Sequence, residues 1–271
     1  MYEAHFGLIH RPFSETVDAA SFLPLPSREA TVRRLRYGLE QARGPVLVHG
    51  PAGTGKTLLA RVLADTLGGH SAHLTFPAMP AADLLAYLAE ELGAPTGGTF
   101  SSEAPLSAAL RRVQRRLAEA AKAGERPLLI VDEAHLIDDP ATFEVLRSLL
   151  NFATLGPPDL SLVLVGSTEM LLRLPHGLSD RLTARCLLGP LSLDESHTYL
   201  NGRLARAGAR EPFFVSSAVA LLHRAAEGLP RRLNRLADLA LLVAYADGLP
   251  RPDARAITIA TSEYDSDPLA A

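Results

Sequence analysis

The sequence predicts an α/β fold in which a parallel β-sheet is flanked by helices, followed by a small all-helical domain. Apolar runs alternate with helical patterns between residues 45 and 190, which is typical of a parallel sheet. A glycine-rich loop stands between the first apolar run and a helix, as expected where a strand turns into its helix. After residue 190 the strand signals stop, whereas helical patterns continue.

Five short apolar runs are the candidate strands of the sheet. Helical periodicity fills the intervals between them, with apolar residues recurring every three or four positions. The segment Gly93–Ser102, which contains three glycines and a proline, is predicted to be a loop. The candidate strands are Val46–His49, Ala72–Phe76, Leu128–Val131, Leu160–Val165 and Arg185–Leu188, and the helices between them include Leu58–Leu67, Pro105–Ala123 and Ala141–Phe152.

The C-terminal part of the chain is predicted to be a helical lid domain. Ser192 and Glu195 have the spacing of a capping box, which would open a helix that reaches about Ala207. Further helices are expected over Ser216–Glu227, Arg231–Ala246 and Asp253–Tyr264. We therefore divide the chain into an N-terminal segment (1–26), an α/β domain (27–190), the helical domain (191–264) and a disordered tail (265–271).

Composition narrows the class of protein. A chain of 271 residues that is 47% hydrophobic can bury a full core. The net charge of −3 and the pI near 6.3 provide no global positive field for nucleic acid or anionic membranes. The single cysteine, Cys186, excludes an internal disulfide, and we see no signal peptide or membrane-spanning run. We expect a cytoplasmic protein without membrane insertion.

Residues 50 to 57 read Gly-Pro-Ala-Gly-Thr-Gly-Lys-Thr, a complete phosphate loop of the pattern G-x-x-x-x-G-K-[ST]. Glycines let backbone N–H groups close around phosphate oxygens. Lys56 can reach the β- and γ-phosphates, and the dipole of the following helix favours an anion. We predict that ATP is bound by Gly50, Pro51, Ala52, Gly53, Thr54, Gly55, Lys56, Thr57 and Leu58.

A buried strand that ends in two carboxylates forms the second part of the site. Asp132, directly after Leu128–Val131, is placed to hold a water of the Mg²⁺ shell opposite Thr57, so the predicted metal ligands are Thr57 and Asp132. Glu133 can polarise an attacking water as general base. The structural alternative is an acidic pair at the start of a helix.

Three further side chains are candidates for catalysis. Ser167, beyond the strand Leu160–Val165, could contact the γ-phosphate or the attacking water; a plain turn is the alternative. Arg181 could neutralise transition-state charge in the site of a neighbouring subunit, with Arg185 as second choice and a surface salt bridge as the alternative. Arg231 follows Gly-Leu-Pro at a helix start, where an exposed cation opposes the helix dipole, which favours an anionic ligand.

Taken in order, these parts resemble an AAA+ ATPase, a class of P-loop NTPase. The branch that is most similar is the general secretion pathway protein A family, which is near the ATPases that regulate transposition. Further matches at the N-terminus, after the acidic pair and in the helical domain support that branch. They are Phe6-Gly7-Leu8 with Pro12-Phe13, Leu146-Arg147-Ser148-Leu149-Leu150-Asn151, Tyr199-Leu200-x-x-Arg203-Leu204-x-x-Ala207-Gly208, and Gly228-Leu229-Pro230-Arg231-Arg232-Leu233-Asn234.

The resemblance implies a five-stranded parallel sheet with a helical lid, a homo-oligomer, and hydrolysis of ATP with Mg²⁺ that is completed across a subunit boundary. It also implies that Phe22–Arg28 borders the adenine. Two departures stand out: family members usually carry glutamine at the position of Ser167, and an Asn-Pro pair at the position of Phe76-Pro77. Secretion-type relatives continue into a membrane span and a wall-binding domain; we see neither in these 271 residues and therefore do not expect a secretion role to transfer.

The leading hypothesis is an oligomeric ATPase whose nucleotide cycle remodels or recruits a protein partner. The alternatives are an ATP-dependent regulator on duplex DNA, and a nucleotide-gated scaffold with little hydrolysis. Two arginine clusters favour DNA, although such clusters are often solvated helix faces. A helicase is excluded, because it needs two motor domains of this size. The clusters are Arg33, Arg34 and Arg36, and Arg111, Arg112, Arg115 and Arg116.

Overall fold

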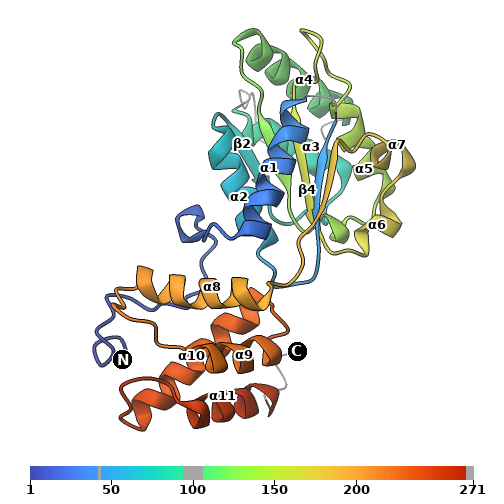
Figure 1. The fold of residues 1–271 in the computed structure, drawn as a ribbon. Helices are drawn as coiled ribbons and strands as arrows, with labels where there is room; N and C mark the ends of the chain where they lie inside the picture. Colours follow the sequence, from blue (N-terminus) through green and yellow to red (C-terminus); the bar gives the residue numbers. More distant parts are fainter. Residues whose placement is uncertain (42–43, 94–105, 267–271) are drawn as a thin grey trace. The chain divides into compact units, whose positions relative to one another are not determined.

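The structure is a computed structural model that describes residues 1–41, 44–93 and 106–266 (Figure 1). The chain forms two compact units. The first, here called the α/β unit, comprises Ala30–Gly50 and Lys56–Leu188. The second, here called the helical unit, joins Met1–Glu29, Pro51–Gly55 and the chain from Gly189 onward. Since both units combine separate stretches of sequence, the domain boundaries at residues 26, 190 and 264 stay a prediction.

A five-stranded parallel sheet forms the centre of the α/β unit, which confirms the predicted fold class. Its strand order is β2-β3-β4-β1-β5, and every pairing is parallel. The carboxyl ends of β1, β3 and β4 therefore meet at one edge of the sheet, where ligands bind in open α/β folds. The strands are β1 Val46–His49, β2 Ser71–Leu74, β3 Leu128–Val131, β4 Ser161–Gly166 and β5 Ala184–Leu187.

Helices cover both faces of this sheet (Figure 1). Successive side chains of a strand point to opposite faces, so Leu47 packs with α3, α4 and α5, whereas Val46 and Val48 pack with α1 and α2. The central strands β1, β3 and β4 are consequently buried at every position and largely apolar, whereas β2 and β5 at the two edges are partly exposed and carry polar residues. The helices are α1 Pro26–Glu40, α2 Lys56–Leu67, α3 Ala81–Glu91, α4 Leu106–Lys122, α5 Pro140–Leu149, and the short α6 Met170–Arg173 and α7 His176–Ser179.

Four helices form the frame of the helical unit, as the sequence predicts. The capping box at the first of them is present: the Ser192 hydroxyl accepts from the N–H of Glu195, and the Glu195 carboxylate accepts from the N–H of Ser192. The N-terminal segment packs into the same core through Tyr2, Phe6 and Phe13. The four helices are α8 Leu193–Arg206, α9 Ser216–Ala225, α10 Pro230–Ala246 and α11 Ala254–Ser266.

Some elements differ from the sequence patterns. Helices α1 and α3 correspond to no predicted element. Strand β2 ends at Leu74, two residues before the exposed Phe76 at which the predicted strand ends. The predicted loop lies outside the described residues except for Gly93. The predicted tail lies outside them from residue 267, and residues 265 and 266 end α11. Within the described ranges, no helix combines the length and apolarity needed to cross a bilayer.

Candidate nucleotide-binding site

The phosphate loop needs glycine at three positions for physical reasons. Gly50 follows β1 directly, and a Cβ atom there would lie 2.2 Å from the carbonyl oxygen of Leu188. Gly53 and Gly55 have φ angles of +77° and +91°, a region that L-residues with side chains rarely adopt. The glycines found by pattern are therefore required by packing at one position and by backbone conformation at the other two.

Lys56 and Thr57 begin α2, at the positive end of that helix. The Lys56 side chain is drawn into the structure: the residue is 9% exposed, and Nζ donates to the carbonyl of Gly50 at 3.0 Å. The Thr57 hydroxyl donates to the carboxylate of Asp132. An ammonium group and a helix N-terminus thus coincide, an arrangement that favours an anion.

Asp132 is the buried carboxylate at the end of β3, and it is 3% exposed. Burial by itself would raise the pKa of this carboxyl, but the nearby His73 ring and hydrogen bonds from Thr57 and the N–H of Glu133 outweigh burial and hold the pKa below its ordinary value. The Glu133 N–H donates to Oδ1 at 2.9 Å. Nε2 of His73 lies 3.5 Å from Oδ2, at the limit of hydrogen-bonding distance, and has no well-aligned partner among the described residues.

An ionised carboxylate joined to a hydroxyl fits Mg²⁺. Magnesium prefers hard oxygen ligands, and Asp132 and Thr57 supply one of each kind on neighbouring elements. In the described part of the chain, no cluster of three or more histidine, cysteine or acidic residues could hold a metal ion. Two protein oxygens suit an ion that keeps several waters and also binds phosphate oxygens, as Mg²⁺ does.

Glu133 has a strained backbone. Its φ and ψ angles are 48° and 35°, in the left-handed region, which costs a residue with a side chain about 1–3 kcal/mol. This turn directs the carboxylate outward: the Glu133 side chain is 45% exposed, whereas the neighbouring Asp132 is buried. Oε2 of Glu133 lies 3.3 Å from Nδ1 of His135. The Glu133 carboxylate is therefore accessible to water at a strained turn.

Ser167 follows β4 and approaches the same histidine. Its N–H points at Nδ1 of His135 at 3.4 Å, an interaction that requires this nitrogen to be unprotonated. An ion pair of His135 with Glu133 would require the opposite, so the two contacts compete for one ring nitrogen. The Ser167 hydroxyl is buried and has no hydrogen-bond partner among the described residues. A buried hydroxyl without a partner is costly and is suited to a ligand.

The two candidate arginines of the α/β unit have different surroundings. Nη1 of Arg181 donates to Oδ1 of Asn151 at 2.7 Å, beyond the end of α5. Nε of Arg185, on the edge strand β5, lies 3.5 Å from Nε2 of His49, which is the last residue before the phosphate loop. Burial, then the charges of Arg185 and Lys56, lower the pKa of His49. Arg185 thus lies near the residue that precedes the phosphate loop of the same chain, whereas Arg181 is hydrogen-bonded to the side-chain amide of Asn151.

Arg231 lies against the phosphate loop within the helical unit. Its backbone N–H donates to the carbonyl of Gly53 at 3.2 Å, and a Cβ atom on Gly53 would lie 2.9 Å from the Cβ of Arg231. The side chain is 55% exposed, and its Nε lies 3.9 Å from Oε2 of Glu15. The N-terminal segment therefore contributes a carboxylate beside this arginine, which no sequence spacing indicates.

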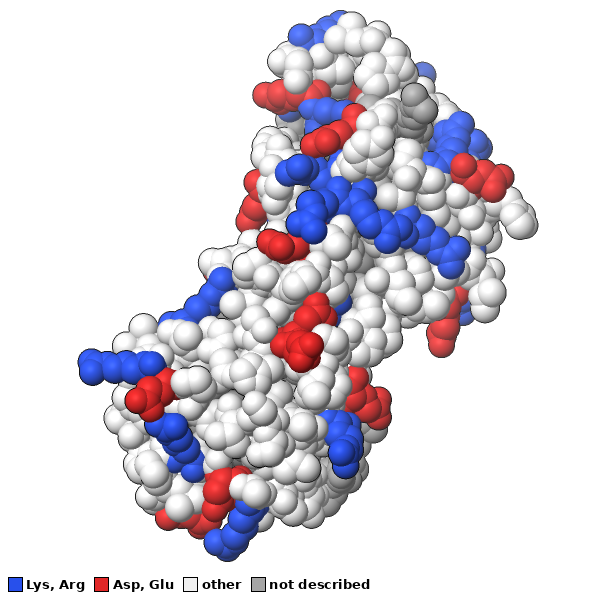
Figure 2. All heavy atoms as spheres, viewed as in Figure 1, with Lys and Arg blue, Asp and Glu red and all other residues white. Residues whose placement is uncertain are grey.

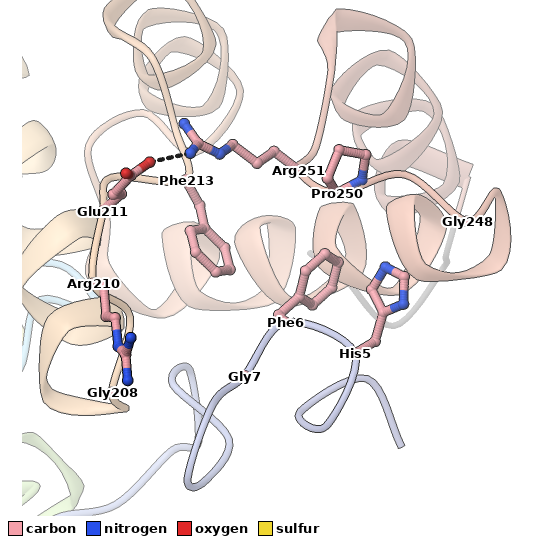
Figure 3. A pocket seen from close by; sticks show the side chains of 10 residues that line it. All are labelled: His5, Phe6, Gly7, Gly208, Arg210, Glu211, Phe213, Gly248, Pro250 and Arg251. Atoms are coloured by element: carbon pink, nitrogen blue, oxygen red, sulfur yellow. Dashed lines mark hydrogen bonds and ion pairs between the residues drawn. The ribbon is translucent and has the colours of Figure 1, made fainter.

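A separate hollow of about 580 Å³ opens in the helical unit (Figure 3). The rings of Phe6 and Phe213 lie 5.5 Å apart in it, and Arg251 forms an ion pair with Glu211 across it. None of the predicted nucleotide-binding residues lines this hollow. Its lining residues are His5, Phe6, Gly7, Gly208, Arg210, Glu211, Phe213, Gly248, Pro250 and Arg251.

A family model described as an AAA domain matches residues 39–174, half of the chain, and this segment contains the phosphate loop, the acidic pair and Ser167. This chain belongs to the AAA domain family. It is 35% identical over 255 residues to General secretion pathway protein A of Aeromonas hydrophila, which covers 92% of this chain and 46% of the relative. The chain thus spans about half the length of that relative.

Solved structures show the same fold. The Orc1 protein of Aeropyrum pernix in complex with DNA has a TM-score of 0.64 at 20% identity, covering 92% of this chain and 71% of that one. Cdc6p of Pyrobaculum aerophilum has a TM-score of 0.72 at 19% identity, covering 93% of this chain and 70% of that one. The RuvB Holliday junction branch migration motor of Thermotoga maritima has a TM-score of 0.60 at 21% identity, covering 90% of this chain and 71% of that one. The resemblance to AAA+ ATPases and to General secretion pathway protein A is confirmed.

Proposed function

We propose that this AAA protein is a Mg²⁺-dependent ATPase. The observation that carries the proposal is the grouping of Lys56, Thr57 and Asp132 at one edge of the sheet: a buried ammonium, a hydroxyl and an ionised carboxylate. Lys56 would bind the β- and γ-phosphates, while Thr57 and Asp132 would hold a magnesium ion, which would supply charge neutralisation at the phosphates. Residues Gly50 to Leu58 supply the remaining contacts to the nucleotide.

Three side chains act around the γ-phosphate in this proposal. Glu133 accepts the proton of the attacking water, since its carboxylate is exposed at a strained turn. The Ser167 hydroxyl forms a hydrogen bond with the γ-phosphate or with the water, which gives this buried group a partner. Arg231 contacts the phosphates from its position against Gly53.

Hydrolysis is completed by a second copy of the chain. Arg181 supplies a positive charge to the site of the neighbouring subunit and stabilises charge in the transition state. Its hydrogen bond to Asn151 presents the guanidinium, and the amide does not neutralise its charge. The protein is therefore a homo-oligomer when active.

The nucleotide cycle remodels or recruits a protein partner. Support comes from the relative named General secretion pathway protein A, since that name places the relative in a secretion pathway. The partner's identity is not encoded in the site, because the same phosphate chemistry serves many AAA proteins.

A second candidate function is ATP-dependent binding of duplex DNA. Positive side chains gather across the α/β unit on the face where α1 and β5 lie (Figure 2). Arg33, Arg34 and Arg36 on α1 and Arg185 on β5 are exposed, although Arg36 also pairs with Glu40. One of the solved structures of this fold is a complex with DNA.

The experiment that tests the main proposal is a turnover assay with ATP and Mg²⁺ on the wild type, Glu133→Gln and Lys56→Ala. We expect turnover in the wild type only, with nucleotide still bound by Glu133→Gln. Turnover that survives Glu133→Gln would contradict the role of Glu133, and binding without any wild-type turnover would favour a nucleotide-gated scaffold. Filter binding of duplex DNA at two salt concentrations tests the second candidate, which predicts a steep salt dependence.

A further inference from the structure

Glu15 of the N-terminal segment faces two arginines of α10. Its Oε2 lies 3.9 Å from Nε of Arg231, and its Oε1 lies 3.3 Å from Nε of Arg235. The two arginines are four residues apart and so lie on the same side of the helix, one turn from each other. One carboxylate thus serves two guanidinium groups, and one of them belongs to the arginine that stands against the phosphate loop.

The backbone that carries Glu15 is held in place. Arg203, 9% exposed on α8, donates from Nε to the carbonyl of Pro12 at 2.8 Å and from Nη2 to the carbonyl of Ser14 at 2.7 Å. Buried charged hydrogen bonds of this kind are among the strong ones. The backbone just before Glu15 is therefore fixed to α8, and this restrains the position from which the Glu15 side chain extends.

The backbone of Arg231 is equally fixed, whereas its side chain is not. Its N–H is bound to the carbonyl of Gly53, but the guanidinium is 55% exposed and Glu15 is 48% exposed. An exposed ion pair of this type is weak, worth about 0–1 kcal/mol. The guanidinium can therefore rotate away from Glu15 at little cost in free energy.

We propose that Glu15 is the resting counter-ion of Arg231 and that the γ-phosphate of a bound nucleoside triphosphate displaces it. This inference rests on the proposed function, in which Arg231 contacts the phosphates. A phosphate group carries more negative charge than a carboxylate and offers the paired oxygens that a guanidinium prefers. A diphosphate lacks the γ-phosphate and leaves the pair intact, so Glu15 is a positioning residue that distinguishes the two nucleotides.

Arg235 gives the displaced carboxylate a place to remain. When Arg231 turns to the phosphate, Glu15 keeps its closer neighbour Arg235, at 3.3 Å, and is not left as an unpaired anion. When a triphosphate binds, the Glu15 carboxylate therefore goes from two guanidinium contacts to one. This connects the nucleotide state to the first residues of the chain.

The test is a fluorescence titration of the full chain with a slowly hydrolysed ATP analogue and with ADP, both with Mg²⁺. Glu15→Gln removes the competing charge while keeping the shape of the side chain. We expect it to tighten binding of the ATP analogue by about two- to fivefold and to leave ADP binding unchanged. Glu211→Gln is the matched control, because Glu211 is also an exposed glutamate of the helical unit paired with an arginine, Arg251 (Figure 3).

The double variant separates this inference from the proposed function. We expect Arg231→Ala to weaken binding of the ATP analogue, and Glu15→Gln to have no further effect in that background. If Arg231→Ala leaves binding of the analogue unchanged, the role of Arg231 in the proposed function fails, and this inference fails with it. If Arg231→Ala weakens binding but Glu15→Gln alone leaves it equal to the wild type or weaker, only the role of Glu15 is overturned. Thermal melts establish that each variant is folded.

Discussion

At the scale of single residues, the site is built from groups held in unfavourable states. Glu133 has a left-handed backbone, and the Ser167 hydroxyl is buried without a partner among the described residues. Each state costs free energy, and such costs gather where a ligand or a reaction offsets them. The sequence identifies these positions by motif. It cannot show their strain, which depends on the surrounding backbone.

Replacement of Glu133 by glycine separates catalysis from stability. Glycine adopts the left-handed backbone at no steric cost, so we expect Glu133→Gly to raise the free energy of unfolding by about 0.5–1 kcal/mol after the entropy of glycine is subtracted. Turnover should fall by at least about 100-fold, because the general base is lost. Denaturant unfolding and a turnover assay measure the two effects.

Glu227 provides the matched control, since it is the other described residue besides glycine with a positive φ angle, 53°. Glu227→Gly should bring a similar gain in stability and leave turnover intact. If Glu133→Gly lowers stability, the strain assigned to this turn is wrong.

The pKa of Asp132 predicts a dependence of stability on pH. Because this pKa is lower in the folded protein than in the unfolded chain, the ionised carboxylate stabilises the fold above its ordinary pKa of about 4. That stabilisation is lost as the pH falls through the lower folded pKa. Unfolding measured between about pH 6 and pH 3 should therefore show a decline in the wild type that is shallower in Asp132→Asn. Equal slopes in the two proteins would count against the hydrogen bonds described for this carboxylate.

At the scale of elements, the sequence predicts best where burial is complete. The strands β1 and β3 have the predicted bounds, because a strand that is covered on both faces is a nearly continuous apolar run, which in β1 is interrupted only by the buried His49. Helix α1 was harder to predict, since its exposed arginines dilute the apolar stripe that contains Leu35 and Leu39. Contacts such as those of His73 with Asp132 and of Glu15 with Arg231 arise from topology, and no local pattern encodes them.

The capping box of α8 makes a prediction at this scale. Ser192→Ala removes the hydroxyl that accepts from the N–H of Glu195, so the free energy of unfolding should fall by about 1 kcal/mol. Thr198→Ala is the control on the same helix, because its hydroxyl bonds only a carbonyl of the preceding turn and its loss should cost nothing. Similar losses in both variants would show that the cap has no special role.

At the scale of the whole molecule, the chain is organised differently from its order in sequence. The fold class follows from the alternation of strands and helices, but residues 1–29 and the loop segment Pro51–Gly55 group with the C-terminal helices. The core explains this: Tyr2, Phe6 and Phe13 are buried among α8 to α11. Such grouping depends on contacts between distant segments, and hydrophobic periodicity carries no information about those.

Completion of the site by a second copy predicts complementation. Arg181→Ala should bind ATP normally but lose turnover by roughly 10³–10⁵-fold, and Glu133→Gln should also be inactive. A mixture of the two should regain activity, because an intact Glu133 in one subunit then meets an intact Arg181 from its neighbour. The turnover of the mixture is compared with that of each variant alone. No recovery, in a mixture shown to assemble, would contradict the role given to Arg181 across the boundary.

The most direct test of the central claim is isothermal titration calorimetry of the folded protein with ATP and Mg²⁺. The account predicts saturable binding below millimolar concentrations in the wild type. It also predicts that Lys56→Ala and Asp132→Ala lose most of this binding, because these residues grip the phosphates and the metal. Absence of binding by the folded wild type at millimolar ATP, or unchanged affinity in both variants, would contradict it.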